Sequence, residues 1–139
     1  MAYGDTTQGP TATEQATSAQ ERQRLRALAD YEVLDTEAED AFDEIVFIAK
    51  TVCETPIALI SLVDSDRQWF KAQIGLAARE MPLEVSICTH ALSQDDVLVV
   101  PDTRLDDRFA DNPLVTADDG LRFYAGALLR TPEGIPIGT

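Results

Sequence analysis

The stretch from Pro56 to Gly75, PIALISLVDSDRQWFKAQIG, is the part of the sequence from which the fold is predicted outward. Residues 57–63 form a short apolar run that by length alone suits a buried helix as well as a strand. The preceding proline, the β-branched residues and the polar turn at 64–67 favour a strand, and residues 68–74 then alternate polar with apolar. The two arms therefore predict an antiparallel hairpin whose first arm is covered on both faces.

The second arm of this hairpin is predicted to lie at or near an edge of its sheet. Phe70 and its alternate neighbours point to one face, whereas Trp69 and Lys71 point to the other. A lysine on a strand discourages pairing with a further strand, so Lys71 indicates an edge or near-edge position.

Two helices are predicted ahead of the hairpin. Residues 1–19 have almost no large apolar side chain and are predicted to form a disordered leader. Ser18 to Glu21 and Thr36 to Glu39 each fit a capping box, which places helices at about 19–30 and 37–54. The second helix has the strongest periodicity in the sequence, with apolar residues three and four apart: Phe42, Ile45, Val46, Ala49, Val52 and Cys53.

The chain after the hairpin is predicted to add three strands and one short helix. Strands are expected at 97–100, 121–131 and 135–139, the helix at 87–93, and loops at 76–85 and 102–115. Hairpins and single strands with helices gathered on one side are typical of an α+β domain with a mostly antiparallel sheet.

The composition of the chain excludes several classes of protein. With 139 residues, of which 45% are hydrophobic, it has material for one domain with a real core. A formal net charge of -14 repels phosphate backbones and anionic lipid, so we expect no nucleic acid and no membrane partner. The sequence has no apolar run of about 18 residues and no secretory signal at its N-terminus. We therefore expect a cytoplasmic protein in which Cys53 and Cys88 are reduced thiols.

Five segments of the sequence, in this order, resemble a GAF domain of the kind found at the N-terminus of bacterial sensor histidine kinases and cyclic-dinucleotide signalling enzymes. They are ERQRLRALADYEVLDTEAEDAFDEIVFIA (21–49), PIALISLVDSDRQWFKAQIGL (56–76), REMPLEVSICTHAL (79–92), VLVVPDTRLDDRFADNPLV (97–115) and LRFYAGALLRTPEGIPIGT (121–139).

The resemblance implies a six-stranded antiparallel sheet with helices on one side and a small-molecule pocket on the other. It places a GAF-like sensory domain at 20–139, behind the leader at 1–19. Similar sequences continue through the strand that begins at Ile137 and then through a closing helix, so we expect both to be missing from this chain. The resemblance also implies an attached output domain and a homodimer.

Cys88 and His90 are the first candidates for chemistry, because His90 is the only histidine in the sequence. Side chains two apart on a helix point about 200° apart, so this pair cannot hold one metal ion, and we expect no metal site. Some GAF photoreceptors attach a bilin at a Cys that is followed directly by His, whereas Thr89 intervenes here. Neither bilin nor haem is expected. The alternative is that Cys88 packs inward while His90 hydrogen-bonds near the rim of the pocket.

The polar segment 102–115 is the second candidate. It is either a solvated loop tied by its own ion pairs, with Phe109 holding it to the core, or a lid whose Arg108 and Asn112 hydrogen-bond a small ligand. Trp69 and Tyr124 either stack on a planar ligand or pack in the core or an interface. The residues expected at a ligand site are Trp69, Cys88, His90, Asp102, Arg108, Phe109, Asn112 and Tyr124.

The function expected from these features is that of a cytoplasmic sensory domain, not of an enzyme. It binds a small molecule, dimerises or does both, and so controls an output domain such as a histidine kinase. The first alternative is a cysteine-dependent reductase of the free methionine sulfoxide type, although Cys53 is expected to be buried at a helix end. The second alternative is a ligand-free structural dimerisation module with a filled pocket.

Overall fold

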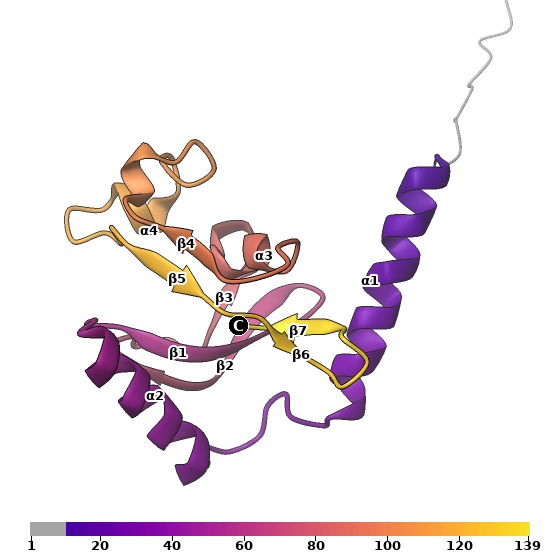
Figure 1. The fold of residues 1–139 in the computed structure, drawn as a ribbon, viewed down its shortest axis with the longest axis horizontal. Coiled ribbons are helices and arrows are strands. Elements are labelled where there is room, and N and C mark those ends of the chain that lie inside the picture. Colours follow the sequence, from indigo (N-terminus) through magenta and orange to yellow (C-terminus); the bar gives the residue numbers. More distant parts are fainter. Residues whose placement is uncertain (1–10) are drawn as a thin grey trace, which may run out of the picture.

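The predicted hairpin is the centre of the fold in the computed structural model, which describes residues 11–139 (Figure 1). β1 (Ala58–Val63) and β2 (Arg67–Ile74) pair antiparallel, with Leu62 opposite Trp69. Helices cover one face of this hairpin, and a smaller lobe made of residues 83–126 lies over the other face. Both faces are thus covered, as predicted, and β2 is buried along most of its length.

A five-stranded antiparallel sheet is built around the hairpin in the order β3-β2-β1-β7-β6. A second sheet contains only β4 and β5. The α+β class and the antiparallel sheet with flanking helices are confirmed. The added strands are β3 (Glu80–Pro82), β4 (Leu98–Val100), β5 (Tyr124–Gly126), β6 (Leu129–Arg130) and β7 (Pro136–Gly138).

The strands do not form the single six-stranded sheet that the resemblance implies. The strand predicted at 121–131 divides into β5 and β6, which belong to different sheets. β5 pairs with β4, whereas β6 pairs with β7, and residues 127–128 between them belong to no strand. Within the described residues, no strand lies between β1 and β5 to connect the two sheets.

The first helix is longer than predicted. α1 spans Ala12–Asp30, so Ser18 lies inside the helix and does not cap it. Residues 12–19, predicted as part of a disordered leader, are helical, while residues 1–10 lie outside the described part of the chain. Once a helix has formed, each added residue contributes one hydrogen bond, so a helix can extend beyond its apolar positions. The N-terminal half of α1 projects away from the rest of the molecule (Figure 1).

The C-terminal half of α1 is fixed to the hairpin. Arg24 is only 6% exposed, and its guanidinium donates to the Val63 carbonyl at 2.6 Å and pairs with Glu21 at 2.7 Å. Leu28 packs in a core cluster with Leu62, Trp69 and Ile137. A buried arginine needs such partners, because an unpaired buried charge is costly.

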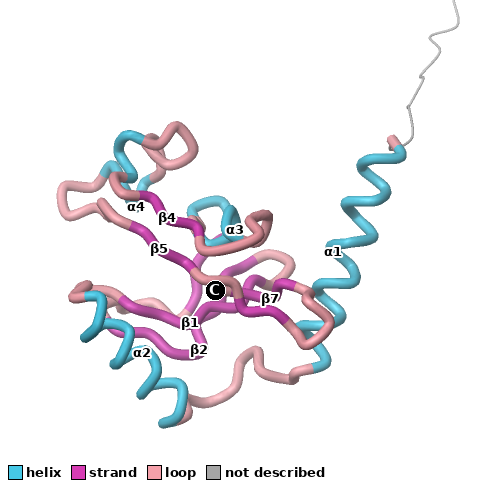
Figure 2. The backbone as a smooth tube through the Cα atoms, in the orientation of Figure 1, coloured by secondary structure: helices cyan, strands magenta, loops and turns pink. Residues whose placement is uncertain are grey.

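The second helix, α2 (Asp40–Cys53), begins later than predicted. Its N-cap is Glu39, and the Thr36 hydroxyl donates to the Val33 carbonyl instead of accepting a hydrogen bond from a helix N–H group. A long loop at 31–39 therefore separates the two helices (Figure 2).

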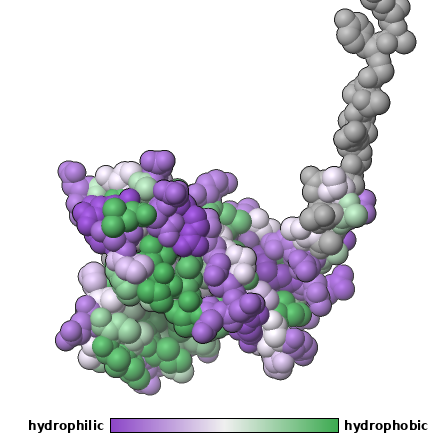
Figure 3. Space-filling view, turned by 45° about the horizontal axis from the view of Figure 1, so that its top comes forward, coloured by the Kyte–Doolittle hydropathy of each residue, from purple (hydrophilic) through white to green (hydrophobic). Residues whose placement is uncertain are grey.

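The apolar stripe of α2 is only partly covered by the sheet. Val46 is 1% exposed, whereas Ile45 is 53% and Val52 is 74% exposed. Cys53 is exposed and not buried as predicted, since the sheet covers only the side of the helix that holds Val46. Figure 3 shows the resulting apolar surface at the lower left of the molecule.

The lobe has a core of its own. Its other elements are η1 (Leu83–Val85), α3 (Cys88–Ala91), η2 (Thr103–Leu105) and α4 (Pro113–Thr116). Its core cluster consists of Ile87, Ala91, Leu98, Val100, Phe109 and Val115. This cluster is distinct from the one formed by α1 and the larger sheet. Among residues 11–139, no helix is long and apolar enough to cross a membrane.

Candidate functional site

Cys88 and Tyr124 come together in the interior, where the lobe faces the larger sheet. Cys88, at the start of α3, is 5% exposed, and the hydroxyl of Tyr124 on β5 is fully buried. That hydroxyl lies beside the Cys88 thiol and the Thr139 hydroxyl, but it makes no hydrogen bond of good geometry with any group in residues 11–139. Burial raises the pKa of the Tyr124 phenol well above its usual range, and the neighbouring Cys88 raises it further.

Ser61 completes this interior group. Its Oγ lies 3.1 Å from the Thr139 Oγ1, and the backbones of the two residues exchange both hydrogen bonds. Three hydroxyls and a thiol therefore meet where β1, β5, β7 and α3 converge. Such neutral groups donate to and accept from a neutral or weakly polar molecule, and the unpartnered Tyr124 hydroxyl is the donor that lacks an acceptor.

His90 and Phe109 lie together on the other side of α3. The two rings contact edge to face, with centroids 4.8 Å apart. Phe109 is fully buried in the lobe core, whereas His90 is exposed. The helix therefore does hold Cys88 inward and His90 outward. The described chain has no group of three or more His, Cys, Asp or Glu side chains placed to hold a metal ion.

The predicted loop residues Asp102, Arg108 and Asn112 are engaged locally. Arg104 binds Asp102 through two hydrogen bonds and holds the pKa of that carboxyl at about 2. Arg108 binds Asp106 in the same way, and the pKa of Asp106 is also lowered to about 2. Asn112 accepts from the Leu114 N–H as the cap of α4 and donates to the Val85 carbonyl at 3.1 Å. These contacts agree with the first of the two predicted alternatives, in which the segment 102–115 is a solvated loop tied by its own ion pairs.

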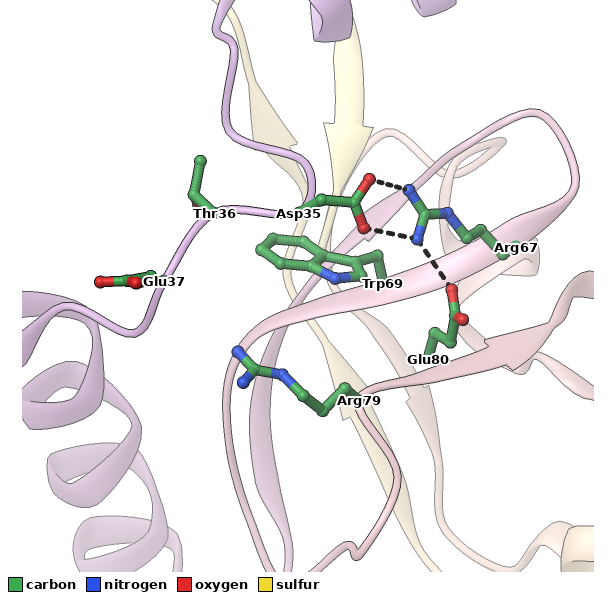
Figure 4. Close-up of a pocket in the computed structure, with 7 residues that line it drawn as sticks. All are labelled: Asp35, Thr36, Glu37, Arg67, Trp69, Arg79 and Glu80. Atoms are coloured by element: carbon green, nitrogen blue, oxygen red, sulfur yellow. Dashed lines mark hydrogen bonds and ion pairs between the residues drawn. The ribbon is translucent and has the colours of Figure 1, made fainter.

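Trp69 lies apart from the other predicted residues, on the helix-covered face of the larger sheet. It lines a pocket of about 360 Å³ between the loop that follows α1 and the strands β2 and β3 (Figure 4). Sequence reasoning did not single out the charged residues of this pocket, because most of them come from the loop at 31–39 and from the start of β3. The lining residues are Asp35, Thr36, Glu37, Arg67, Trp69, Arg79 and Glu80.

Arg67 is the centre of an ion-pair network in this pocket. Its guanidinium donates to both Asp35 oxygens at 2.8 and 2.7 Å and to Glu80 at 2.8 Å, and its Nε pairs with Asp64 at 3.2 Å. The hydrogen bonds from Arg67 lower the pKa of Asp35 and, together with those to the other carboxylates, raise the pKa of Arg67. Asp35 has a φ of 60°, a left-handed conformation that costs free energy and is held here by its contact with Arg67.

The predicted near-edge position of β2 is confirmed, but Lys71 does not prevent β2 from pairing with a further strand, contrary to the prediction. Lys71 is 2% exposed, and β3 pairs with the outer side of β2. Its Nζ lies 2.5 Å from Glu39 and donates to the Thr36 hydroxyl at 2.8 Å and the Glu37 carbonyl at 2.7 Å. The side chain points into the loop before α2 and fixes it to β2.

Comparison with known proteins identifies the family. The family model of the GAF domain matches residues 37–139. The chain belongs to the GAF domain family. This GAF domain is 46% identical over 107 residues to a cyclic di-GMP phosphodiesterase of Pseudomonas aeruginosa, a match that covers 77% of the chain but 18% of the phosphodiesterase. The chain thus spans less than a fifth of the length of that relative.

Two solved structures share the fold of this GAF domain. A type II free methionine-R-sulfoxide reductase from Thermoplasma acidophilum matches with a TM-score of 0.55 at 14% identity, over 71% of this chain and 68% of the reductase. The GAF domain of an Acinetobacter phosphoenolpyruvate-protein phosphotransferase matches with a TM-score of 0.53 at 15% identity, over 85% and 72% of the two chains. At these identities the likeness concerns the fold alone.

Proposed function

We propose that this GAF domain is the sensory part of a cytoplasmic signalling protein. A small molecule bound between the lobe and the larger sheet biases an attached output domain. A cyclic-dinucleotide enzyme is the favoured output, because the relative with 46% identity is named a cyclic di-GMP phosphodiesterase. A histidine kinase is the alternative output.

The buried Tyr124 hydroxyl is the observation that carries this proposal. A buried donor without an acceptor costs about 1–3 kcal/mol. A ligand oxygen or nitrogen at this position recovers that loss, so the folded domain with ligand is favoured over the folded domain without it. The neighbouring Cys88, Ser61 and Thr139 supply further neutral partners.

The arrangement of β2 gives this binding a route to the helices. On the lobe side, Gln68 accepts a hydrogen bond from Ser86, which lies just before α3, and both residues are at most 2% exposed. On the opposite face, Arg67 and Lys71 hold the loop that follows α1. A ligand that favours one position of α3 therefore changes the position of that loop, provided that its affinity differs between the two states.

Native mass spectrometry of the purified chain tests the proposal. We expect a retained small molecule in the wild type and none in Tyr124→Phe, which keeps the ring and removes only the hydroxyl. The exposed Tyr31→Phe is the matched control and should retain the molecule. A wild type without any bound molecule, together with a Tyr124→Phe variant of higher thermal stability, would instead support a ligand-free structural module.

Dimerisation is the second part of the proposed function. Ile45, Ile48 and Val52 leave an apolar stripe exposed along α2, and contiguous exposed apolar surface is typical of an interaction site. Sedimentation equilibrium of the wild type and of Ile48→Lys measures this directly. A monomeric wild type at all concentrations would refute the dimer.

A further inference from the structure

We propose that the Arg67 pocket is a second ligand site and that it binds a free α-amino acid with an apolar side chain. This site lies on the helix-covered face of the larger sheet, opposite the lobe, and is independent of the ligand proposed to contact Tyr124. Its volume of about 360 Å³ falls in the range of small-molecule pockets, which begins at about 300 Å³.

Three charged groups of the pocket are already paired with one another within the protein. Arg67 binds Asp35 and Glu80, as the dashed lines in Figure 4 show. The Thr36 hydroxyl is also satisfied, because it donates to the Val33 carbonyl and accepts from Lys71. These groups form one wall of the pocket, and each of them is already engaged by a partner within the protein.

Three polar groups of the pocket remain unused. The Arg79 guanidinium, the Glu37 carboxylate and the Trp69 ring nitrogen take part in no side-chain hydrogen bond or ion pair within residues 11–139. Figure 4 shows the guanidinium of Arg79 close to the Trp69 ring, with the carboxylate of Glu37 on the side facing α2. The pocket thus offers two kinds of donor at one end and an acceptor at the other.

The balance of these free groups selects the class of ligand. One unpaired guanidinium and one unpaired carboxylate match a molecule that carries one carboxylate and one ammonium group, as a free amino acid does. A phosphate or a dinucleotide is disfavoured, because Asp35, Glu37 and Glu80 put three carboxylates around the pocket against two guanidinium groups.

Trp69 accounts for the preference for an apolar side chain. Its indole is 4% exposed and packs on Leu28, Leu62 and Ile137, so it forms a rigid apolar floor. The part of the indole that lines the pocket offers a ligand side chain a van der Waals contact with an apolar surface. The bound amino acid would bridge Glu37, in the loop after α1, to Arg79, in the loop before β3. It would therefore fix the loop between α1 and α2 to the sheet.

Trp69 also supplies the measurement, because it is the only tryptophan in the sequence. L-phenylalanine, L-leucine and L-methionine are titrated into the 139-residue chain while Trp69 emission is followed, and calorimetry confirms each affinity. Hydrocinnamate lacks the ammonium group of phenylalanine, and phenethylamine lacks its carboxylate. We expect at least one of the amino acids to bind, and each phenylalanine analogue to bind roughly tenfold more weakly than phenylalanine itself.

Two variants test the polar contacts without disturbing the fold. Arg79→Gln and Glu37→Gln change only side chains that have no partner in the described structure, and each should weaken binding roughly tenfold. Arg104→Gln, on the lobe, is the matched control and should bind as the wild type does.

The outcomes separate this proposal from the preceding one. The second site would be overturned if none of the three amino acids changes Trp69 emission. It would also be overturned if the analogues bind as tightly as phenylalanine, or if Arg79→Gln binds with unchanged affinity. Loss of amino-acid binding in Tyr124→Phe would also overturn it, because the ligand would then lie between lobe and sheet. Binding that survives in Tyr124→Phe but is lost in Arg79→Gln supports the second site, whatever mass spectrometry finds at Tyr124.

Discussion

Two aspartates of the lobe, Asp102 and Asp106, each bind the arginine two positions further along the chain. These contacts lower the pKa of each carboxyl from 3.8 to about 2. A carboxyl with a lowered pKa in the folded state stabilises that state at pH values above its unfolded pKa. The contribution is lost as the pH falls from about 4 through about 2, where both carboxyls become protonated.

We therefore expect the melting temperature to fall over this acidic window, and to fall less steeply in Asp102→Asn/Asp106→Asn. Circular dichroism melts at a series of pH values measure both slopes. Asp118→Asn is the control, because Asp118 binds no arginine within residues 11–139. High salt should reduce the difference between the variants, since exposed ion pairs are screened. Equal slopes in the wild type and the double variant would contradict the prediction.

Lys71 shows what the sequence can and cannot predict for a single residue. The alternation of β2 correctly placed Lys71 on the same face as Trp69, away from Phe70. Its burial was not predictable, because its hydrogen-bond partners Thr36 and Glu37 lie 35 and 34 residues earlier in the chain. A lysine without known partners is expected in solvent, and only the tertiary fold supplies those partners.

Among the elements, α2 has one buried and one exposed apolar side. Val46 is 1% exposed and Ile48 is 58% exposed, although they lie two positions apart on the same helix. In a dilute monomer, Val46→Ala should lower the free energy of unfolding by about 2 kcal/mol, because it removes buried apolar surface and leaves a cavity. Ile48→Ala should change it by at most about 0.5 kcal/mol. Urea unfolding followed by circular dichroism measures both.

Protein concentration distinguishes the monomer from the proposed dimer in the same experiment. If the free energy of unfolding lost in Ile48→Ala grows with protein concentration, a second copy covers the outer side of α2. If Ile48→Ala lowers the free energy of unfolding of the dilute protein as much as Val46→Ala does, the helix does not have one buried and one exposed apolar side.

The periodicity of the sequence predicted α2 as a helix but not how much of its stripe the sheet covers. In the sequence, the apolar residues from Phe42 to Cys53 form one predicted face. In the structure, the sheet packs mainly against the side of the helix that contains Val46. The resemblance to GAF domains predicted the order of the elements and the layers. The division of 121–131 between two sheets was not predictable, because it depends on the tertiary pairing of β5 with β4 and of β6 with β7.

At the scale of the whole molecule, residues 11–139 contain two separate hydrophobic cores, one in the lobe and one between α1 and the larger sheet. Phe109 is fully buried in the first, and Trp69 belongs to the second. Two side-chain contacts that join the lobe to the sheet are the Ser86–Gln68 hydrogen bond and the bond from Arg130 to the Gln94 carbonyl. Because the two core clusters share no residue, we expect the lobe to open without unfolding the sheet, as in a ligand-gated region.

Phe109→Ala tests this independence, because the loss of a buried phenylalanine costs about 3–5 kcal/mol, a large share of the 5–15 kcal/mol typical of a domain. Hydrogen exchange should accelerate in residues 87–126, while the amides of β1 and β2 keep their protection. The urea midpoint of Trp69 emission should also stay unchanged. Val99→Ala, at a 52% exposed position of β4, is the control and should leave hydrogen exchange unchanged both in residues 87–126 and in β1 and β2. If instead the hairpin amides accelerate by the same factor as the lobe amides, the two cores unfold as one unit, and a ligand between them has no separate lobe to move.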